Sequence, residues 1–429
     1  MYFGLMIAIF VIGYAMIALE HPLKINKSAT AVLLAAVIWA VFALFGPGMK
    51  DGALIHHLGE TAEILFFLLG AMTIVEIVDK HDGFSIITDR ITTTSKRKLL
   101  WIISILTFFM SAVLDNLTTS IVMCALLRKL VGDKNTRWFF AGMVILAANA
   151  GGAWSPIGDV TTIMLWIKGN ITAGNIILET IIPSLVSLLV PVAIIGMTMK
   201  GKLERPEKVV VEGTSSVTRK QSLLILCMGV GLLLFVPFFK TITHLPPYLG
   251  ILFGLGILWI TTEIMHKNNP SNYSRLNVTA IIQKVDVPSV LFFLGILMAV
   301  SCLNEAGHLA LLAESLDKLG NVYVINIVIG VLSSIIDNVP LVAAAMGMYP
   351  IEAIGNFAVD GAFWEGLAYC AGTGGSLLII GSAAGVAVMG MEKIDFIWYL
   401  KKISLWALIG YLAGAGTFYL MSQFIFHAA

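Results

Sequence analysis

Apolar residues fill most of this chain in runs long enough to cross a lipid bilayer, with short polar stretches between the runs. A helix needs about 20 apolar residues to span the hydrocarbon core. We predict spanning helices at residues 2–19, 28–45, 61–79, 138–168, 177–199, 219–239, 247–265, 287–302, 361–390 and 402–426. The pattern therefore predicts an all-α polytopic membrane protein and excludes a water-soluble fold.

Two further apolar runs, residues 99–131 and 321–349, predict re-entrant helical hairpins instead of simple spans. Basic residues flank the first run at both ends, which favours the cytoplasm for both. Acidic residues flank the second run at both ends, which favours the outside. Each run carries Asp-Asn near its middle, at residues 115–116 and 337–338. The two hairpins are therefore expected to meet from opposite sides of the membrane.

Composition agrees with this assignment, and the placement of charge sets the orientation. Of the 429 residues 58% are hydrophobic and 12% charged, and 27 Lys and Arg nearly balance 26 Asp and Glu, so no charge excess points to nucleic acid. With the N-terminus outside, all basic residues fall on cytoplasmic segments except Lys50, Lys168, Lys240 and Lys318. We therefore predict an integral protein of the cell (inner) membrane with both termini external.

The two halves of the chain share a pattern. Leu-Phe-Phe-Leu occurs at residues 65–68 and 291–294, and Asp-Asn follows 50 and 46 residues later. A Gly-rich break comes after each Asp-Asn, at residues 149–156 and 371–376. Five spans and one hairpin per half invert the second half relative to the first, and inverted repeats with broken helices are typical of secondary transporters. We assign the first repeat to residues 1–199, a cytoplasmic linker to 200–218 and the second repeat to 219–429.

Carboxylates inside the apolar runs are the candidate chemistry, because every Lys and Arg lies at or near the end of a run. These acidic residues are Glu63, Glu76, Asp115, Asp159, Asp337 and Glu365. A buried carboxylate without a basic partner is costly unless it takes a proton or binds a cation, and a group that does both can exchange one for the other. The alternative for Glu76 and Glu365 is hydrogen bonding to Ser and Thr on adjacent helices, or a position that faces the membrane surface. Glu63 and Glu76 are candidates for a proton path.

The Asp-Asn pairs stand where each hairpin must reverse, and an opened helix frees backbone carbonyls. With the carboxylate and amide oxygens, these carbonyls suit a small alkali cation. The break at residues 149–159 supplies a second wall of the site; a proline kink in a packed helix is the alternative. No carboxylate in the second break matches Asp159. The predicted cation- and proton-binding residues are Asp115, Asn116, Thr118, Thr119, Asn149, Ser155, Asp159, Thr162, Asp337, Asn338, Thr373 and Ser376.

Other features add less. The four Cys each lie alone in an apolar run, as packing residues do, and most His lie in predicted loops, where a pH-sensing role is a minor alternative to solvation. Residues 83–98 can form an amphipathic helix in the inner interface, with a counterpart at 303–320 outside. Either segment is a simple loop helix or a mechanical arm.

With Asp115-Asn116-Leu117-Thr118-Thr119, the break from Asn149 to Asp159, and Asp337-Asn338-Val339-Pro340 in place, the chain resembles the NhaD-type sodium/proton antiporters of the ion transporter superfamily. That superfamily also includes sodium-coupled dicarboxylate carriers and arsenite permeases. The dicarboxylate branch carries Ser-Asn-Thr at its hairpin tips, so Asp-Asn at both tips here counts against an organic anion.

The resemblance extends over nearly the whole chain and implies an elevator architecture. A transport domain, residues 99–199 and 321–429, would slide along a scaffold domain, residues 1–82 and 219–302. The resemblance also implies a homodimer formed through the scaffold domain.

The expected function is secondary active exchange of cytoplasmic Na⁺, or Li⁺, for external protons. The ion would bind at Asp115, Asn116, Asn149 and Asp159 and leave when protons take the carboxylates. Alternatives are a sodium-coupled symporter of a small oxyanion or dicarboxylate, an arsenite efflux permease and a passive channel. An intramembrane aspartic protease is disfavoured because its Gly-x-Gly-Asp and Tyr-Asp motifs are missing. We expect no enzyme activity and no cofactor, with the bilayer and the transported ions as partners.

Overall fold

The computed structural model describes residues 2–47, 52–203, 217–267 and 276–426, and every regular element in these ranges is a helix. Single helices correspond to eight of the predicted spans. They are α1 (Tyr2–Ala18), α3 (Lys27–Phe45), α4 (Ala53–Lys80), α10 (Ala173–Thr198), α11 (Arg219–Thr243), α12 (Pro247–His266), α15 (Val287–Glu305) and α22 (Ser404–Met421), which ends in a π-helical turn, Ser422–Phe426. The prediction of an all-helical membrane protein is confirmed.

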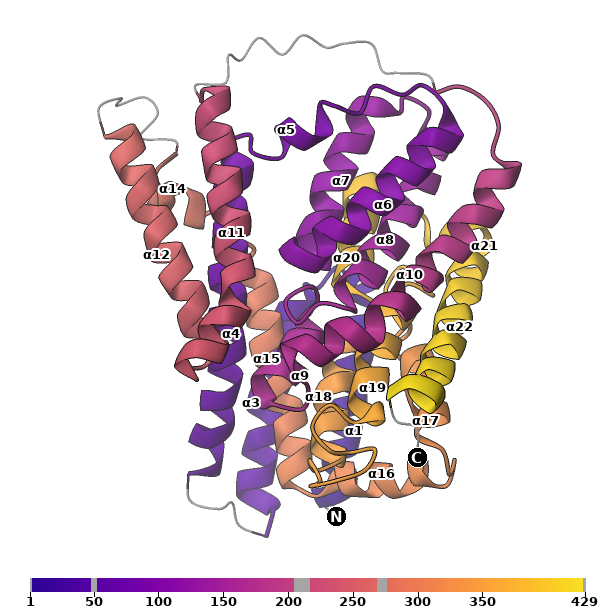
Figure 1. Cartoon of the computed structure of the whole chain (residues 1–429). Coiled ribbons are helices and arrows are strands. Elements are labelled where there is room, and N and C mark those ends of the chain that lie inside the picture. The colour runs from indigo at the N-terminus through magenta and orange to yellow at the C-terminus, as the bar shows by residue number, and fades with distance from the viewer. Residues whose placement is uncertain (1, 48–51, 204–216, 268–275, 427–429) are drawn as a thin grey trace.

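Four predicted elements are pairs of helices separated by non-helical residues. The pairs are α6 (Lys96–Leu114) with α7 (Asn116–Leu130), α8 (Lys134–Gly152) with α9 (Val160–Lys168), α17 (Val322–Leu332) with α18 (Asn338–Met348), and α19 (Ala362–Gly374) with α20 (Ala383–Glu392). The chain reverses between α6 and α7 and again between α17 and α18 (Figure 1). Both predicted hairpins and both predicted broken helices are therefore present.

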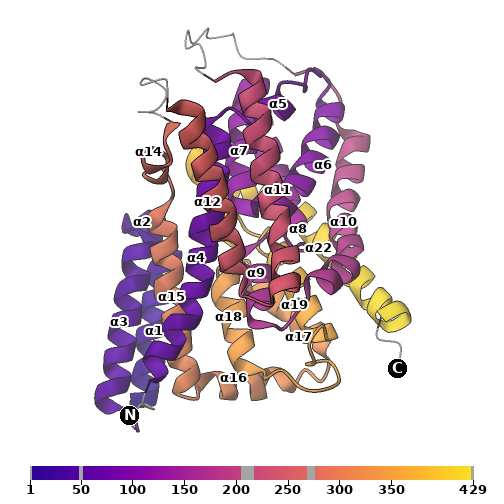
Figure 2. The same cartoon turned by 60° about the vertical axis from the view of Figure 1, so that its left-hand side comes forward.

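The helices divide into two groups that we call the six-helix layer and the hairpin layer. The six-helix layer consists of α1, α3, α4, α11, α12 and α15, and the hairpin layer of α6 to α10 and α17 to α22, with α21 at Phe396–Lys402. Figure 2 shows α1, α3 and α15 together on one side of the molecule. The α6–α7 hairpin enters from the end where α11 begins, and the α17–α18 hairpin from the end where α1 begins (Figure 1). Opposite entry places the two hairpin tips deep in the molecule.

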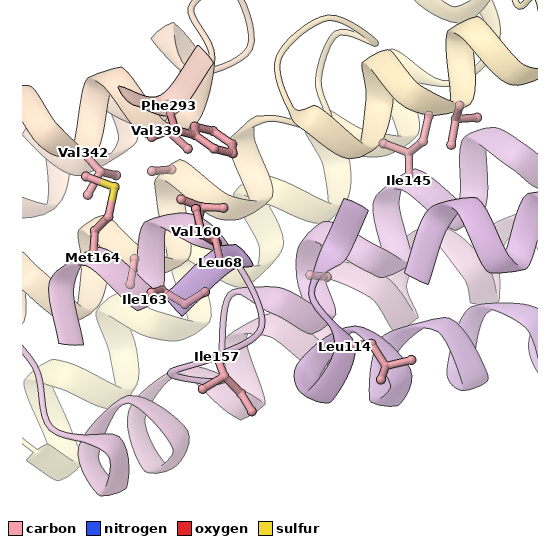
Figure 3. Close-up of a cluster of buried hydrophobic side chains, with 14 of the residues drawn as sticks. Leu68, Leu114, Ile145, Ile157, Val160, Ile163, Met164, Phe293, Val339 and Val342 are labelled. Carbon is pink, nitrogen blue, oxygen red and sulfur yellow. The ribbon is translucent and has the colours of Figure 1, made fainter. Parts of the chain in front are cut away.

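The two layers meet mainly through apolar side chains. Figure 3 shows part of this cluster, which joins Leu68 of α4 and Phe293 of α15 to residues beside the hairpin tips and broken helices. The labelled residues from the hairpin layer are Leu114, Ile145, Ile157, Val160, Ile163, Met164, Val339 and Val342. Polar contacts also cross the interface: Lys168 pairs with Glu60, and Lys240 donates to the carbonyl of Trp166 at 2.7 Å.

The predicted amphipathic helix over residues 83–98 is wrong, since only α5 (Ser85–Thr88) is helical before α6 begins. The β-branched run of residues 92–94 disfavours helix. This run is not helical, and the Leu203 N–H donates to the Thr94 carbonyl at 2.7 Å. The predicted counterpart at residues 303–320 is helical over α16 (His308–Asp317). Most of the predicted linker, residues 204–216, lies outside the described residues.

A buried carboxylate fastens the two halves of the hairpin layer together. The oxygens of Glu392, at the end of α20, accept from Nε of Arg128 at 2.6 Å and from Nε of Arg137 at 2.8 Å. The Glu392 side chain is only 2% exposed. Both arginines come from the α7–α8 corner of the first half, so this triad joins segments more than 250 residues apart.

We expect Glu392→Ala to destabilise the protein by about 2 kcal/mol, because two arginines lose their partner, although Arg128 is half exposed and remains hydrated. Thermal unfolding in detergent measures the effect. Glu314→Ala, on the exposed face of α16, is the matched control. Equal unfolding temperatures for the two variants would contradict the fastening role.

Candidate cation-binding site

Asp115 forms the tip of the first hairpin in a strained backbone conformation. Its φ of 72° and ψ of 161° fall in a region that L-residues rarely adopt. The carboxylate caps α7 by accepting from the Thr118 N–H at 2.8 Å and the Thr118 hydroxyl at 2.9 Å. Asp115 shares a small cavity with Phe67, Leu68 and Leu233 of the six-helix layer. The first tip therefore faces an apolar wall.

Asp337 forms the tip of the second hairpin and has polar neighbours. Its carboxylate caps α18 by accepting from the Val339 N–H at 3.2 Å. Its own N–H donates to the Tyr14 hydroxyl at 2.8 Å, and Nζ of Lys27 lies 3.8 Å from its Oδ2. The prediction that the intramembrane acids lack basic partners is therefore wrong for Asp337, because Lys27, although it opens α3, reaches the hairpin tip.

Asp159 is the carboxylate at which the two hairpin tips converge. It caps α9, where Thr162 completes a capping box. Its Oδ2 accepts from Nδ2 of Asn116 at 2.8 Å and from Nδ2 of Asn338 at 3.1 Å. Asp159 is 1% exposed, and the charges of both Asp337 and Asp115 act on it. One oxygen atom thus joins the first hairpin, the second hairpin and the break between α8 and α9.

Asn149 extends this network into the second broken helix. Its Oδ1 accepts from Nδ2 of Asn116 at 3.0 Å, and its Nδ2 donates to the hydroxyls of Ser376 at 2.9 Å and Ser382 at 3.0 Å. All four interrupted elements therefore contribute to one buried polar cluster, which we call the tip network: Asn116, Asn149, Asp159, Asn338, Ser376 and Ser382.

Ser382 was not predicted, although the sequence contains a signal for it. It follows Gly375 by seven residues, as Asp159 follows Gly152 by seven. Each residue is the N-cap of the helix after the break, with φ of −145° in both cases. A hydroxyl thus stands in the second half where the first half has a carboxylate.

Further contacts recur in the two halves. Ser111, four residues before Asp115, donates to the Ala148 carbonyl at 2.6 Å. Ser333, four residues before Asp337, donates to the Ala371 carbonyl at 2.8 Å. Each hairpin is therefore fixed to its own broken helix by the same kind of bond, close to the tip.

Several predicted site residues lie beside the tip network without joining it. Ser155 donates to the Ala112 carbonyl at 2.5 Å, and Thr373 donates to the Tyr369 carbonyl of its own helix at 2.6 Å. The buried hydroxyls of Thr119 and Thr161 have no hydrogen-bond partner in the described part of the chain. These two hydroxyls are additional oxygen ligands available close to Asp115 and Asp159 in sequence.

The remaining acids occupy other surroundings. Glu76 pairs with Lys80 at 3.0 Å, so it too has a basic partner, and Glu63 lies near enough to Lys240 for its charge to act there. Glu365 is fully buried at the start of α19, where the charges of Glu179 and Asp360 act on it, and among the described residues no Ser or Thr hydroxyl bonds to it. The Ser and Thr partners considered for Glu365 are therefore not found. A proton path through Glu63 and Glu76 stays a prediction.

Similarity to known families places the chain among membrane transporters. Residues 6–364 match the CitMHS family, described as citrate transporter, and the chain belongs to this family. The chain also resembles the solved YdaH transporter of Alcanivorax borkumensis in fold, with a TM-score of 0.54 at 12% identity, over 93% of this chain and 97% of that one.

Close relatives place the chain more narrowly. It is 49% identical to Sodium/proton antiporter 1 of Arabidopsis thaliana over 96% of this chain and 71% of that protein, and 45% identical to Sodium/proton antiporter 2 of the same plant over 98% and 100%. It is 32% identical to the Na⁺/H⁺ antiporter NhaD of Alkalimonas amylolytica over 98% and 91%. The chain belongs to the NhaD-type sodium/proton antiporters, which confirms the resemblance stated from the sequence.

Proposed function

We propose that the protein exchanges cytoplasmic Na⁺ for external protons, with Asp159 at the centre of the site. The observation that carries the proposal is the convergence of both hairpin tips on Asp159 Oδ2. Among the described residues, no Lys, Arg or His forms an ion pair with this buried carboxylate. Such a group takes a proton or a cation to become neutral, and the two exclude each other. The activity of the relatives agrees with this reading.

The neighbouring amides can serve both forms of Asp159. Asn116 and Asn338 donate their Nδ2 atoms to the carboxylate. Rotation of either amide by about 180° presents its Oδ1 atom instead, which is a ligand for a hard cation. One carboxylate with neutral amide and hydroxyl oxygens suits a monovalent ion such as Na⁺ or Li⁺. Asp115, close to Asp159, provides a further carboxylate for the ion or for a second proton.

Alternating access follows if the hairpin layer moves along the six-helix layer when the site is neutralised. The proposed scaffold domain is residues 1–82 and 219–302, and the proposed transport domain is residues 99–199 and 321–429. The apolar interface of Figure 3 supports sliding because few polar contacts must break. Ser111 and Ser333 make the same kind of hydrogen bond in the two halves of the chain, and the two hairpins enter from opposite ends. Both observations support an inverted repeat. An inner-membrane location, external termini and a dimer through the scaffold domain complete the proposal.

The test uses proteoliposomes with an acidic lumen and a lumenal pH dye, to which NaCl, LiCl or KCl is added outside. We expect sodium to alkalinise the lumen in the wild type, and Asp115→Asn to slow this response at least about tenfold because it removes a carboxylate next to the site. Asn tolerates positive φ better than most residues, so the variant is expected to fold. No sodium response from active, reconstituted wild type would contradict the proposal.

A further inference from the structure

The two hairpin tips meet the six-helix layer in different ways. Asp115 faces the apolar side chains of Phe67, Leu68 and Leu233. Asp337 instead lies 3.8 Å from the ammonium of Lys27 on α3, and its N–H is bonded to the Tyr14 hydroxyl on α1. Among the described residues, only the tip carboxylate of the second hairpin, Asp337, therefore contacts a charged group of the six-helix layer.

Lys27 is held in place by its own layer. Its backbone N–H donates to the carboxylate of Glu20 at 3.2 Å, and its ammonium lies 4.3 Å from the centre of the Phe292 ring on α15. The next residue, Ser28, donates to the Pro288 carbonyl at 2.6 Å. The Lys27 side chain is 17% exposed and that of Asp337 is 8% exposed, so little solvent screens the pair. The ammonium thus presents a fixed positive charge at the depth of the second tip.

Other charges near Asp337 do not replace this partner. The carboxylate of Asp159 is near enough to be coupled to Asp337, and it is negative when ionised. Tyr14 contributes a neutral hydroxyl from α1. The carboxylate of Glu20 accepts from the backbone N–H of Lys27. Lys27 is therefore the counter-charge of Asp337 in this arrangement.

We propose that Lys27 is a tethered counter-ion that competes with Na⁺ and protons for Asp337 and ties the second hairpin to α3. The proposal rests on the sodium/proton exchange proposed above and adds a positioning residue to it. A proton or a sodium ion on Asp337 removes the charge that holds Lys27, so the tie is released only when this carboxylate is occupied. Movement of the hairpin layer is thereby coupled to occupancy, which exchange requires because an empty carrier must not cross.

Lys27→Gln tests the competition, with Lys27→Arg as the charge-preserving variant and Lys24→Gln as the matched control. Lys24 is exposed and lies three residues away in the same connection. The measurement is made at about pH 8.5, because a low proton concentration keeps competition from protons small. We expect Lys27→Gln to lower the sodium concentration for half-maximal exchange at least about fivefold. Lys27→Arg and Lys24→Gln are expected to stay near the wild type.

A second measurement separates competition from a general structural effect. The sodium-dependent rise in unfolding temperature in detergent reports binding even in a variant that does not transport. When Asp337 is present, Lys27→Gln should shift the sodium concentration at which the unfolding temperature rises. In an Asp337→Asn background, adding Lys27→Gln should not change that concentration. The inference is overturned if Lys27→Gln matches Lys24→Gln, if Lys27→Arg matches Lys27→Gln, or if the shift persists without Asp337. A wild type without any sodium response overturns the proposed function and this inference together.

Discussion

Asp159→Asn is expected to abolish sodium-driven proton movement in proteoliposomes while leaving the fold intact. The substitution keeps the shape of the side chain, and Asn caps a helix as well as Asp does, so α9 should still begin at Val160. The negative charge on which both hairpin tips converge is lost. Removing a buried charged partner costs about 2–5 kcal/mol of binding, so we expect sodium affinity to fall by about 30-fold or more.

The control for this prediction is Asp133→Asn, the N-cap of α8 at the end of the molecule away from the tip network. Hydrogen bonds from Thr136 hold the pKa of Asp133 below its usual value, so this variant also removes a charged cap. We expect Asp133→Asn to exchange sodium like the wild type. Proton movement by Asp159→Asn at the rate of Asp133→Asn would show that the convergence of the tips on Asp159 is not the transport site.

The interrupted elements could be predicted from sequence because their signals are strong. A run of apolar residues that starts and ends in the same kind of charge predicts a hairpin, and a polar Asp-Asn pair in its middle marks the point of reversal. Glycines and a proline within residues 149–159 interrupt a spanning helix for local reasons. These signals are sufficient to bring Asp115, Asp159 and Asp337 forward as candidates.

The partners of these acids could not be predicted in the same way, since they depend on three-dimensional packing. Lys27 stands at the end of an apolar run, where basic residues normally reach water, yet α3 begins deep enough for its ammonium to contact Asp337. Ser382 is one of many Ser residues, and only its N-cap conformation places it against Asn149. The sequence predicts Thr373 as a site residue because it lies in the Gly-rich break, but its hydroxyl bonds to a carbonyl of its own helix.

Close backbone contacts hold the hairpins against the broken helices around the tip network, and they leave no room for a Cβ atom at two glycines. A Cβ atom on Gly374 would lie 2.0 Å from the carbonyl oxygen of Gly330, and a Cβ atom on Gly151 would lie 2.2 Å from that of Phe108. Gly330 and Phe108 each lie on the first arm of a hairpin, α17 and α6 respectively. Each residue precedes the tip aspartate of its hairpin, Asp337 or Asp115, by seven residues. We expect Gly374→Ala to destabilise the protein by about 3 kcal/mol or more, because backbone atoms cannot move aside as a side chain can.

Gly416→Ala on α22 is the control, since a Cβ atom there meets nothing within 4 Å. Alanine in a helix interior is favoured over glycine by up to about 1 kcal/mol, so this variant should unfold at or slightly above the wild-type temperature in detergent. Gly151→Ala should behave like Gly374→Ala, because the same arm-to-helix contact recurs in the other half. Equal unfolding temperatures for Gly374→Ala and Gly416→Ala would contradict backbone-to-backbone packing of the hairpin arms. The contacts that bring Asn116 and Asn338 to one oxygen of Asp159 would then not depend on this packing.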